Sequence, residues 1–204
     1  MKRLLQNPKR DFNDRDFAIR YIKKHEKIAE KLGRKVSKRL TALGFRTGKI
    51  LDAGCGFGGT DIFLSQYFPE SEIIGIDLSE TLLQHADMLL RKSNAENRVK
   101  FERADIHKIP FEKDTFNAVL SINMVHLVDN PVKMINEIER VLHPGGYLLV
   151  IDIRRSLLGI IEKEFTTALT LDEARELFTQ TNIMNGTFSQ DFFYWEFYTT
   201  IPLE

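Results

Sequence analysis

Between residues 49 and 153, five short apolar runs alternate with segments of helical periodicity, and this alternation restricts the fold more than any other feature of the sequence. The apolar runs are Lys49–Ala53, Glu72–Leu78, Val99–Asp105, Phe116–Ile122 and Tyr147–Ile153. Strands that alternate with helices form right-handed βαβ crossovers, which build a parallel sheet covered by helices on both faces. The sequence therefore predicts an α/β fold.

The helical segments between these runs carry their own start signals. We expect helices near Thr60–Phe68, Glu80–Lys92 and Val132–Leu142, where apolar residues recur at helical spacing. Ser79 can cap the second helix, and Pro131 suits the first turn of the third. These signals support the βαβ interpretation.

The two ends of the chain have different patterns. Residues Asp14–Leu43 have helical periodicity, and we expect Gly33 to divide them into two helices. Near the other end, Thr170–Glu173 is a capping box that opens a helix. Gly186–Ser189 and Phe192–Thr200 then resemble two strands with a tight connection. The prediction is a mostly parallel, seven-stranded sheet closed by an antiparallel C-terminal edge hairpin.

Length and composition indicate one globular domain. The chain has 204 residues, 43% of them hydrophobic and 28% charged. With Cys55 as the sole cysteine, no intramolecular disulfide can form, so a reducing, cytoplasmic setting is expected. No apolar run approaches the length of a membrane span, and the amino terminus lacks the apolar core of a secretory signal.

Charge is distributed unevenly although the net charge is zero. Residues 1–50 hold 16 Lys or Arg and 5 Asp or Glu, a local charge of +11. Such a region can bind an anionic partner, but it is more often the solvated face of a helix. Without a nucleic-acid recognition motif, we disfavour nucleic acid as a partner. The lysines concerned are Lys23, Lys24, Lys27, Lys31, Lys35 and Lys38.

The segment Ile50–Gly59 carries the strongest functional signal. Its sequence, ILDAGCGFGG, ends a strand at Asp52 and places glycines at 54, 56, 58 and 59 before a helix. Glycines let a ligand approach the backbone closely, and the start of a helix presents free N–H groups. A nucleotide-like ligand is therefore expected at this loop.

Two ligand classes fit this loop. Gly54, Gly56 and Gly59 satisfy the dinucleotide pattern G-x-G-x-x-G, with Asp77 placed to take ribose hydroxyls. However, a carboxylate at Asp52 opposes a pyrophosphate and suits a ligand that carries an ammonium and a sulfonium. The third strand also ends at Asp105, which offers an acceptor for an adenine amino group. These observations favour S-adenosylmethionine (SAM) and leave an NAD-dependent oxidoreductase as the alternative.

Residues 49–153 resemble the class I SAM-dependent methyltransferases, in particular the small-molecule branch that includes the ubiquinone and menaquinone C-methyltransferases. Four sequence blocks carry the resemblance, in the family's order and at its spacing. They are ILDAGCGFGG (50–59), IIGIDLSETLL (73–83), ADIHKIPFEKDTFNAVLS (104–121) and IERVLHPGGYLLVID (138–152). The resemblance covers about half of the chain. It implies a Rossmann-like three-layer sandwich and methyl transfer from SAM, with S-adenosylhomocysteine as product.

The resemblance also implies which residues hold the methionine portion of the cofactor. Asp52, Gly54 and Gly56 would bind it, the glycines mainly through their backbone. Ser121, at the end of the fourth strand, would offer its carbonyl to the methionine ammonium. A small residue at a strand end is common in any core, so for Ser121 a structural role is an equal alternative.

Four further residues would hold the adenosyl portion. Asp77 would accept both ribose hydroxyls, and Asp105 would accept the adenine amino group. Leu78 and Ile106 would lie near opposite faces of the adenine ring. An aspartate at a strand end can also simply cap the next turn, and Leu78 can equally be ordinary core.

Methyl transfer from a sulfonium is an in-line displacement, so the protein mainly positions the nucleophile and excludes water. A general base is needed only for some acceptors. His126 is the candidate catalytic residue, with Asn123 nearby to orient an acceptor. A loop histidine is also often structural. The remaining histidines lack metal-ligand spacing, so no metal is expected.

The chain is interpreted as one SAM-dependent methyltransferase domain, 1–204, in which 1–47 form a helical lid and substrate region and 48–204 form the α/β core. Aromatic side chains in the first part can cover the cofactor. The aromatic segment 192–198 could line the acceptor pocket or pack as an edge strand. The acceptor is expected to be a small or medium-sized molecule, and the sequence indicates no oligomeric state. The lid candidates are Phe12, Phe17 and Tyr21.

A non-catalytic SAM-binding protein is a further alternative, because the fold can persist after catalysis is lost. Turnover of a methyl acceptor separates this alternative from an enzyme. Binding of NADH in place of SAM would identify the oxidoreductase instead.

Overall fold

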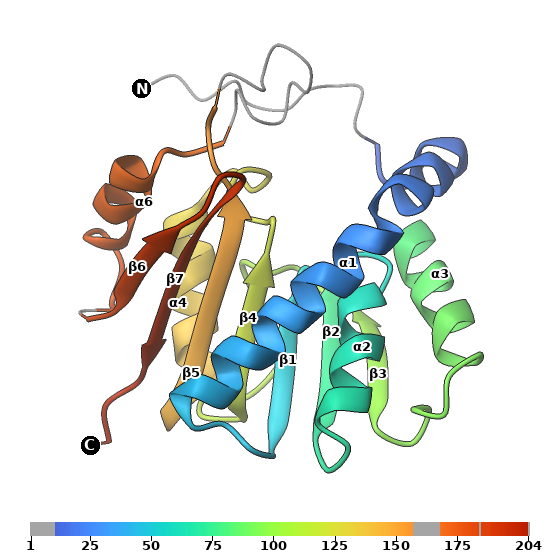
Figure 1. The fold of residues 1–204 in the computed structure, drawn as a ribbon, viewed down its shortest axis with the longest axis horizontal. Helices are drawn as coiled ribbons and strands as arrows, with labels where there is room; N and C mark the ends of the chain where they lie inside the picture. Colours follow the sequence, from blue (N-terminus) through green and yellow to red (C-terminus); the bar gives the residue numbers. More distant parts are fainter. Residues whose placement is uncertain (1–10, 157–167, 184, 204) are drawn as a thin grey trace.

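The computed structural model describes residues 11–156, 168–183 and 185–203, and in this part of the chain seven strands form one sheet (Figure 1). The order across the sheet is β3-β2-β1-β4-β5-β7-β6. The strands are β1 Lys49–Ala53, β2 Glu72–Asp77, β3 Val99–Arg103, β4 Phe116–Ile122, β5 Leu142–Ile153, β6 Thr187–Gln190 and β7 Tyr194–Thr200. The helices are α1 Arg15–Leu43, α2 Gly59–Tyr67, α3 Glu80–Leu90, α4 Pro131–Val141 and α6 Leu171–Phe178.

Strand direction follows the prediction. Strands β1 to β5 pair in parallel, whereas β7 runs antiparallel to both β5 and β6. The chain winds outward from β1 to β3 and then crosses back to place β4 on the other side of β1. Loops that leave β1 and β4 therefore diverge, and a crevice opens between them at the carboxyl ends of the strands. The predicted α/β sandwich with an antiparallel edge hairpin is confirmed.

The two faces of the sheet bury separate hydrophobic cores. On one face, Leu40 of α1, Leu64 of α2 and Leu90 of α3 pack on the strands. On the other face, Ile135 of α4 and Phe178 of α6 do the same. Figure 1 shows α1 and α2 in front of the sheet and α4 behind it. Because helices cover both faces of the sheet, a ligand can reach the strands mainly at their ends.

Helix α1 is continuous through Gly33, so the predicted division into two helices is wrong. A Cβ atom at this position would lie 2.7 Å from the ring of Phe63, which packs against the helix there. The glycine therefore permits close packing of α2 on α1 and does not interrupt the helix. In the described part of the chain, neither α1 nor any other helix combines the length and apolar composition that a bilayer span requires.

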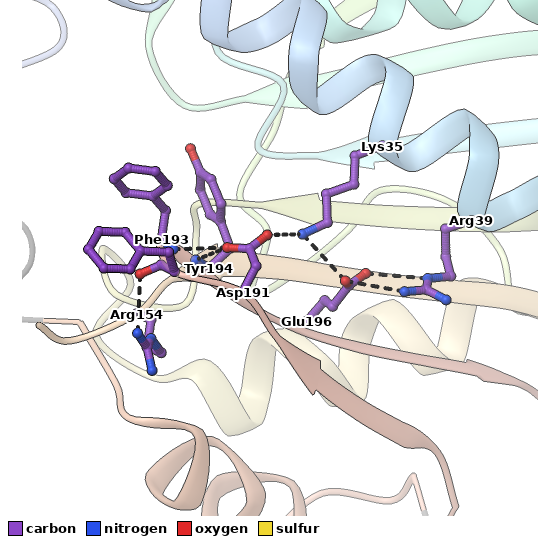
Figure 2. A network of polar contacts seen from close by, with 8 residues as sticks. Lys35, Arg39, Arg154, Asp191, Phe193, Tyr194 and Glu196 are labelled. Carbon is purple, nitrogen blue, oxygen red and sulfur yellow. Dashed lines mark hydrogen bonds and ion pairs between the residues drawn. The ribbon is translucent and has the colours of Figure 1, made fainter.

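Charged side chains connect α1 to β7 (Figure 2). Glu196 is 5% exposed and lies 3.3 Å from Nζ of Lys35 and 3.2 Å from Nη2 of Arg39. Lys35 also contacts Asp191 at 2.7 Å, and the guanidinium of Arg39 lies 4.1 Å from the ring centroid of Tyr198. This charged cluster holds the N-terminal helix against the antiparallel edge.

Strand β5 begins earlier than predicted. The sequence predicts a helix through Leu142 and a strand from Tyr147, but α4 ends one residue earlier and Leu142 already belongs to β5. Leu142 pairs with Phe116, and Tyr147 pairs with Ala118. The register shift between these pairs accommodates residues 143–146, whose proline and glycines mask the strand in the sequence.

The aromatic segment at the C-terminal edge packs into the core. Trp195 and Phe197 are buried, and the ring centroid of Phe197 lies 4.0 Å from that of Phe178 and 4.8 Å from that of Phe188. No residue of segment 192–198 lines the cavity described below. Edge-strand packing is therefore correct for the part of this segment that belongs to β7, whereas Phe192 and Phe193 are 64% and 48% exposed.

Candidate cofactor and acceptor site

A cavity of about 690 Å³ lies at the carboxyl ends of β1, β2 and β4. Its volume falls within the range of about 300–1,000 Å³ that accommodates small organic ligands. Helix α1 and the loops after these strands provide its walls. Of the predicted site residues, those that line the cavity are Asp52, Gly54, Gly56, Asp77, Leu78, Ile106 and His126. Asp105 and Ser121 do not.

The glycine loop brings bare backbone to this cavity. Gly54 and Gly56 have φ angles of 99° and 56°, in the left-handed region that side chains disfavour. The amides of Gly54 and Cys55 both donate to the carbonyl of Ile76, at 2.8 and 3.0 Å, which fixes the loop on β2. A Cβ at Gly54 would lie 2.3 Å from Cγ of Met124. The loop thus requires glycine both for its conformation and for space.

Asp77 ends β2 with both carboxylate oxygens engaged by backbone. The amide of Gly56 donates to Oδ2 at 2.9 Å, and the amide of Ser79 donates to Oδ1 at 2.8 Å. Burial raises the pKa of Asp77, while these donors act in the opposite direction. Each oxygen retains acceptor capacity, so the carboxylate is rigidly placed with free lone pairs near the cavity.

Asp52 is buried at the end of β1, with 2% of its surface exposed. Its Oδ1 has no hydrogen-bond donor among the described residues. Burial and the charge of Asp77 raise the pKa of Asp52 to about 7. A buried carboxyl without a donor is costly, and a cationic ligand group at this position would remove the cost.

The predicted adenine residues divide into two groups. Leu78 lines the cavity with 54% of its surface exposed, and Ile106 lines it as a buried residue. Asp105 is more exposed, and its Oδ1 accepts from the amide of His107 at 2.8 Å and contacts the His107 ring Nδ1 at 2.9 Å. The hydrogen bond from the amide of His107 is the main cause that lowers the pKa of Asp105. Asp105 thus lies beside the cavity, next to two residues that line it.

Ser121 is fully buried within β4, where it pairs with Val150. The two residues after it, Ile122 and Asn123, line the cavity instead. Asn123 adopts a left-handed φ of 58°, and its buried Oδ1 has no donor among the described residues. Asparagine tolerates this backbone conformation better than most residues. The strand end thus presents an amide side chain with unused hydrogen-bonding capacity.

His126 lies on the loop after β4, and its side chain is held by Asp152 of β5. Its ring Nδ1 lies 2.6 Å from Oδ1 of Asp152, and its backbone amide donates to Oδ2 at 3.0 Å. The two side chains are 4% and 1% exposed. Because a carboxylate accepts at Nδ1, the neutral ring carries its proton there and its lone pair on Nε2. A buried carboxylate thus sets the tautomer of a histidine that lines the cavity.

Aromatic side chains from the N-terminal segment and α1 border the cavity. Phe12, Tyr21 and His25 line it, whereas Phe17 packs on Phe12 with ring centroids 5.3 Å apart. Ser79 donates through Oγ to the carbonyl of Phe12 at 2.6 Å, which ties this segment to the start of α3. Two of the three predicted lid residues therefore face the cavity.

Sequence reasoning missed three residues of this region. His25 lines the cavity, Asp152 holds His126, and Asp61 lies buried in the first turn of α2. Asp152 had a usable signal, since a carboxylate within an apolar strand is rarely buried without a partner. The acid in the first turn of α2 is usual for any helix and gave no such signal.

The model of the family "Methyltransferase domain" matches residues 46–197, which cover β1 to β7 apart from the last residues of the final strand. The chain belongs to this methyltransferase domain family. The predicted membership in the class I SAM-dependent methyltransferases is confirmed, and with it SAM as the cofactor of the class.

Several proteins resemble this methyltransferase domain. An uncharacterized methyltransferase of Schizosaccharomyces pombe is 39% identical over 50% of this chain and 39% of its own. A demethylmenaquinone methyltransferase of Lactococcus lactis is 32% identical over 63% of this chain and 52% of its own. The chain thus spans about half or less of the length of these curated relatives.

The overall fold also matches a solved structure along its full length. The crystal structure of a candidate SAM-dependent methyltransferase from Methanococcus maripaludis superposes with a TM-score of 0.79 and 17% identity, over 98% of each chain. At this identity the similarity establishes the fold. It includes the N-terminal region before the family match, so α1 has a counterpart in that protein.

Proposed function

We propose that this domain transfers a methyl group from SAM to a small or medium-sized acceptor that must lose a proton, with His126 as the general base. The observation that carries the proposal is one cavity lined by Asp52, Asp77 and the buried histidine. We also propose that 1–204 act as a single domain, with 1–47 as its lid and substrate region. Residues 1–10 of that region lie outside the described residues.

The residues present fit the cofactor. The unpartnered Oδ1 of Asp52 suits the α-ammonium of SAM, and Gly56 leaves open space beside the loop, since a Cβ there would have its nearest neighbour, Cδ1 of Leu82, at 4.0 Å. Asp77 has lone pairs for two ribose hydroxyls, a charge-assisted contact. When bound, SAM supplies an electrophilic methyl group on a sulfonium. The neighbouring Asp105 would take the adenine amino group, with Leu78 and Ile106 beside the ring, and Ser121 would contribute only through its backbone.

The pair His126–Asp152 acts on the acceptor. The Nε2 lone pair of His126 takes the acceptor's proton as the nucleophile forms, and Asp152 stabilises the resulting imidazolium. Asn123 can orient the acceptor through its unused amide oxygen. A base is needed for a hydroxyl or a carbon acid and is superfluous for a thiolate. The site therefore favours oxygen or carbon acceptors.

The cavity wall near these groups is mainly apolar. Its lining includes Ile28 and Leu32 of α1, together with Met124, Leu127 and Val128 of the loop that carries His126. Apolar walls with a few polar groups bind a largely apolar acceptor and hold water away from the methyl group. The similarity to a protein named for a menaquinone precursor supports an acceptor of this kind.

Binding and turnover test the proposal directly. Isothermal titration with SAM, S-adenosylhomocysteine and NADH identifies the cofactor, and we expect heat with the first two alone. Methyl-labelled SAM with a panel of quinols, phenols, hydroxy acids and thiols then identifies the acceptor. Binding of NADH in place of SAM would contradict the proposal.

Substitutions of His126 and Asp152 test the proposed base and the carboxylate that holds it separately. His126→Gln is expected to lower kcat by about 10²–10⁴-fold with little change in SAM affinity. Asp152→Asn should also lower kcat, but by less, because the imidazolium loses its carboxylate partner. His143→Gln, on an exposed residue away from the cavity, is the matched control. An unchanged kcat in His126→Gln would remove the general base from the mechanism.

A further inference from the structure

The side chains of Asp52 and Asp61 are buried neighbours beneath the glycine loop, and each influences the pKa of the other. Asp52 lies near the end of β1 and lines the cavity, and Asp61 belongs to the first turn of α2. Asp61 has no exposed surface, and Asp52 has 2%. The two side chains thus form a buried acid pair, and Asp52 is the member that reaches the ligand space.

This pair has no cation among the described residues. Both oxygens of Asp61, like Oδ1 of Asp52, lack an N–H or O–H donor in hydrogen-bond geometry. Two ionised carboxylates in contact away from water repel each other strongly, whereas one carboxylic acid can donate to one carboxylate. In the ligand-free protein the pair is therefore best satisfied by one shared proton.

The groups around Asp52 and Asp61 favour the state with one shared proton. Across the loop, Asp77 of β2 adds negative charge, and the Cys55 thiol is neutral because burial raises its pKa well above the usual value. Burial and the charge of Asp52 likewise raise the pKa of Asp61 well above its usual value. The other titratable side chains that line the same cavity are Asp11, Tyr21, His25, His107, His126 and Asp129.

We propose that Asp61 is a second acid of the cofactor site, and that the Asp52–Asp61 pair releases its shared proton when the α-ammonium of SAM binds. The inference rests on the proposed function. The carboxylic O–H bond breaks, its proton passes to the solvent buffer, and an N–H of the ammonium takes its place as the hydrogen-bond donor. No electrons are transferred. Asp61 acts through Asp52, so it is a positioning residue.

Proton release on binding can be counted. Titrations of SAM and S-adenosylhomocysteine at about pH 6.5, in buffers of different ionisation enthalpy, give the protons released per ligand bound. We expect the wild-type protein to release close to one proton with either ligand. 5′-Methylthioadenosine keeps the adenosine and lacks the ammonium, so it should bind more weakly and release none.

Substitution assigns the proton to the pair. In Asp61→Asn the amide donates to Asp52 and keeps it ionised, so the cofactor still binds while proton release falls towards zero. Asp87→Asn makes the same chemical change at an exposed position of α3 and should leave the count unchanged.

The outcomes separate the inference from the proposed function. If wild-type protein binds neither SAM nor S-adenosylhomocysteine, the proposed function fails. If it binds them without releasing a proton, or if Asp61→Asn releases as many protons as wild type, the inference fails. Should the variant not fold, equal proton release by S-adenosylhomocysteine and 5′-methylthioadenosine on the wild-type protein would overturn it.

Discussion

Two buried acids in this molecule have opposite surroundings. Glu196 of β7 is nearly inaccessible, and it contacts both Lys35 and Arg39 (Figure 2). Asp61 of α2 is fully buried, and both of its carboxylate oxygens lack a hydrogen-bond donor among the described residues. The first acid is compensated by cations of the chain itself. The second lacks such compensation in the described structure.

This difference separates a structural role from a ligand-binding role. A compensated acid cross-links α1 and β7, and its cost of burial is offset within the folded chain. An uncompensated acid destabilises the ligand-free protein, so its retention points to a charge that arrives from outside. Substitutions at the two sites should therefore change the free energy of unfolding in opposite directions.

Removal of the cations around Glu196 is expected to have the largest effect on stability. The double substitution Lys35→Met and Arg39→Met leaves the buried carboxylate without a partner and should lower the free energy of unfolding by about 3 kcal/mol. Urea denaturation at neutral pH measures this loss. The same changes at the exposed Lys31 and Lys38 are the control. A loss no larger than that of the control pair would mean that Glu196 is not held by these cations.

Asp61→Asn should raise the free energy of unfolding at neutral and higher pH. Burial raises the pKa of Asp61 in the folded state, so its contribution to stability is present at low pH and is lost as pH rises through that pKa. At pH 8 the asparagine variant should be more stable than wild type without ligand by about 1–3 kcal/mol. The gain should largely disappear near pH 3, where the acid is mainly neutral in both states. Urea denaturation at the two pH values tests the sign, and a loss at pH 8 would refute the comparison.

Asp105→Asn should have the smallest effect on stability. This aspartate is exposed and already accepts from the amide of His107, so the free energy of unfolding should change by less than about 0.5 kcal/mol. SAM affinity should fall by about fivefold to tenfold if the carboxylate takes the adenine amino group. Titration with SAM checks this change. An unchanged affinity would exclude Asp105 from the site.

Local patterns predicted the central part of the fold correctly. The glycine loop, the cap at Ser79 and the capping box at Thr170 depend on neighbours within a few residues, so their spacing is visible in the sequence. The parallel direction of the central strands followed from the alternation of β and α segments. The carboxylates Asp52 and Asp77 were found because each lies at the end of a strand.

Contacts between distant segments were not predictable in this way. Gly33 is read from sequence as a break, because the ring of Phe63 that packs on it is 30 positions away. Asp61 resembles an ordinary first-turn acid in the sequence, and its burial depends on how α2 packs in the folded chain. Asp152 is recognisable as an acid that needs a partner, but its partner is a histidine 26 positions earlier, which the sequence does not identify.

The hydroxyl of Ser79 has a further consequence for the order of events. This hydroxyl donates to the backbone carbonyl of Phe12, and the amide of Ser79 donates to Asp77. The proposed ribose site is therefore connected to the N-terminal border of the cavity. Binding of the methyl donor at the proposed ribose site should therefore restrict the motion of the N-terminal border. We therefore expect compulsory-order kinetics in which the methyl donor associates before the acceptor and its demethylated product departs last.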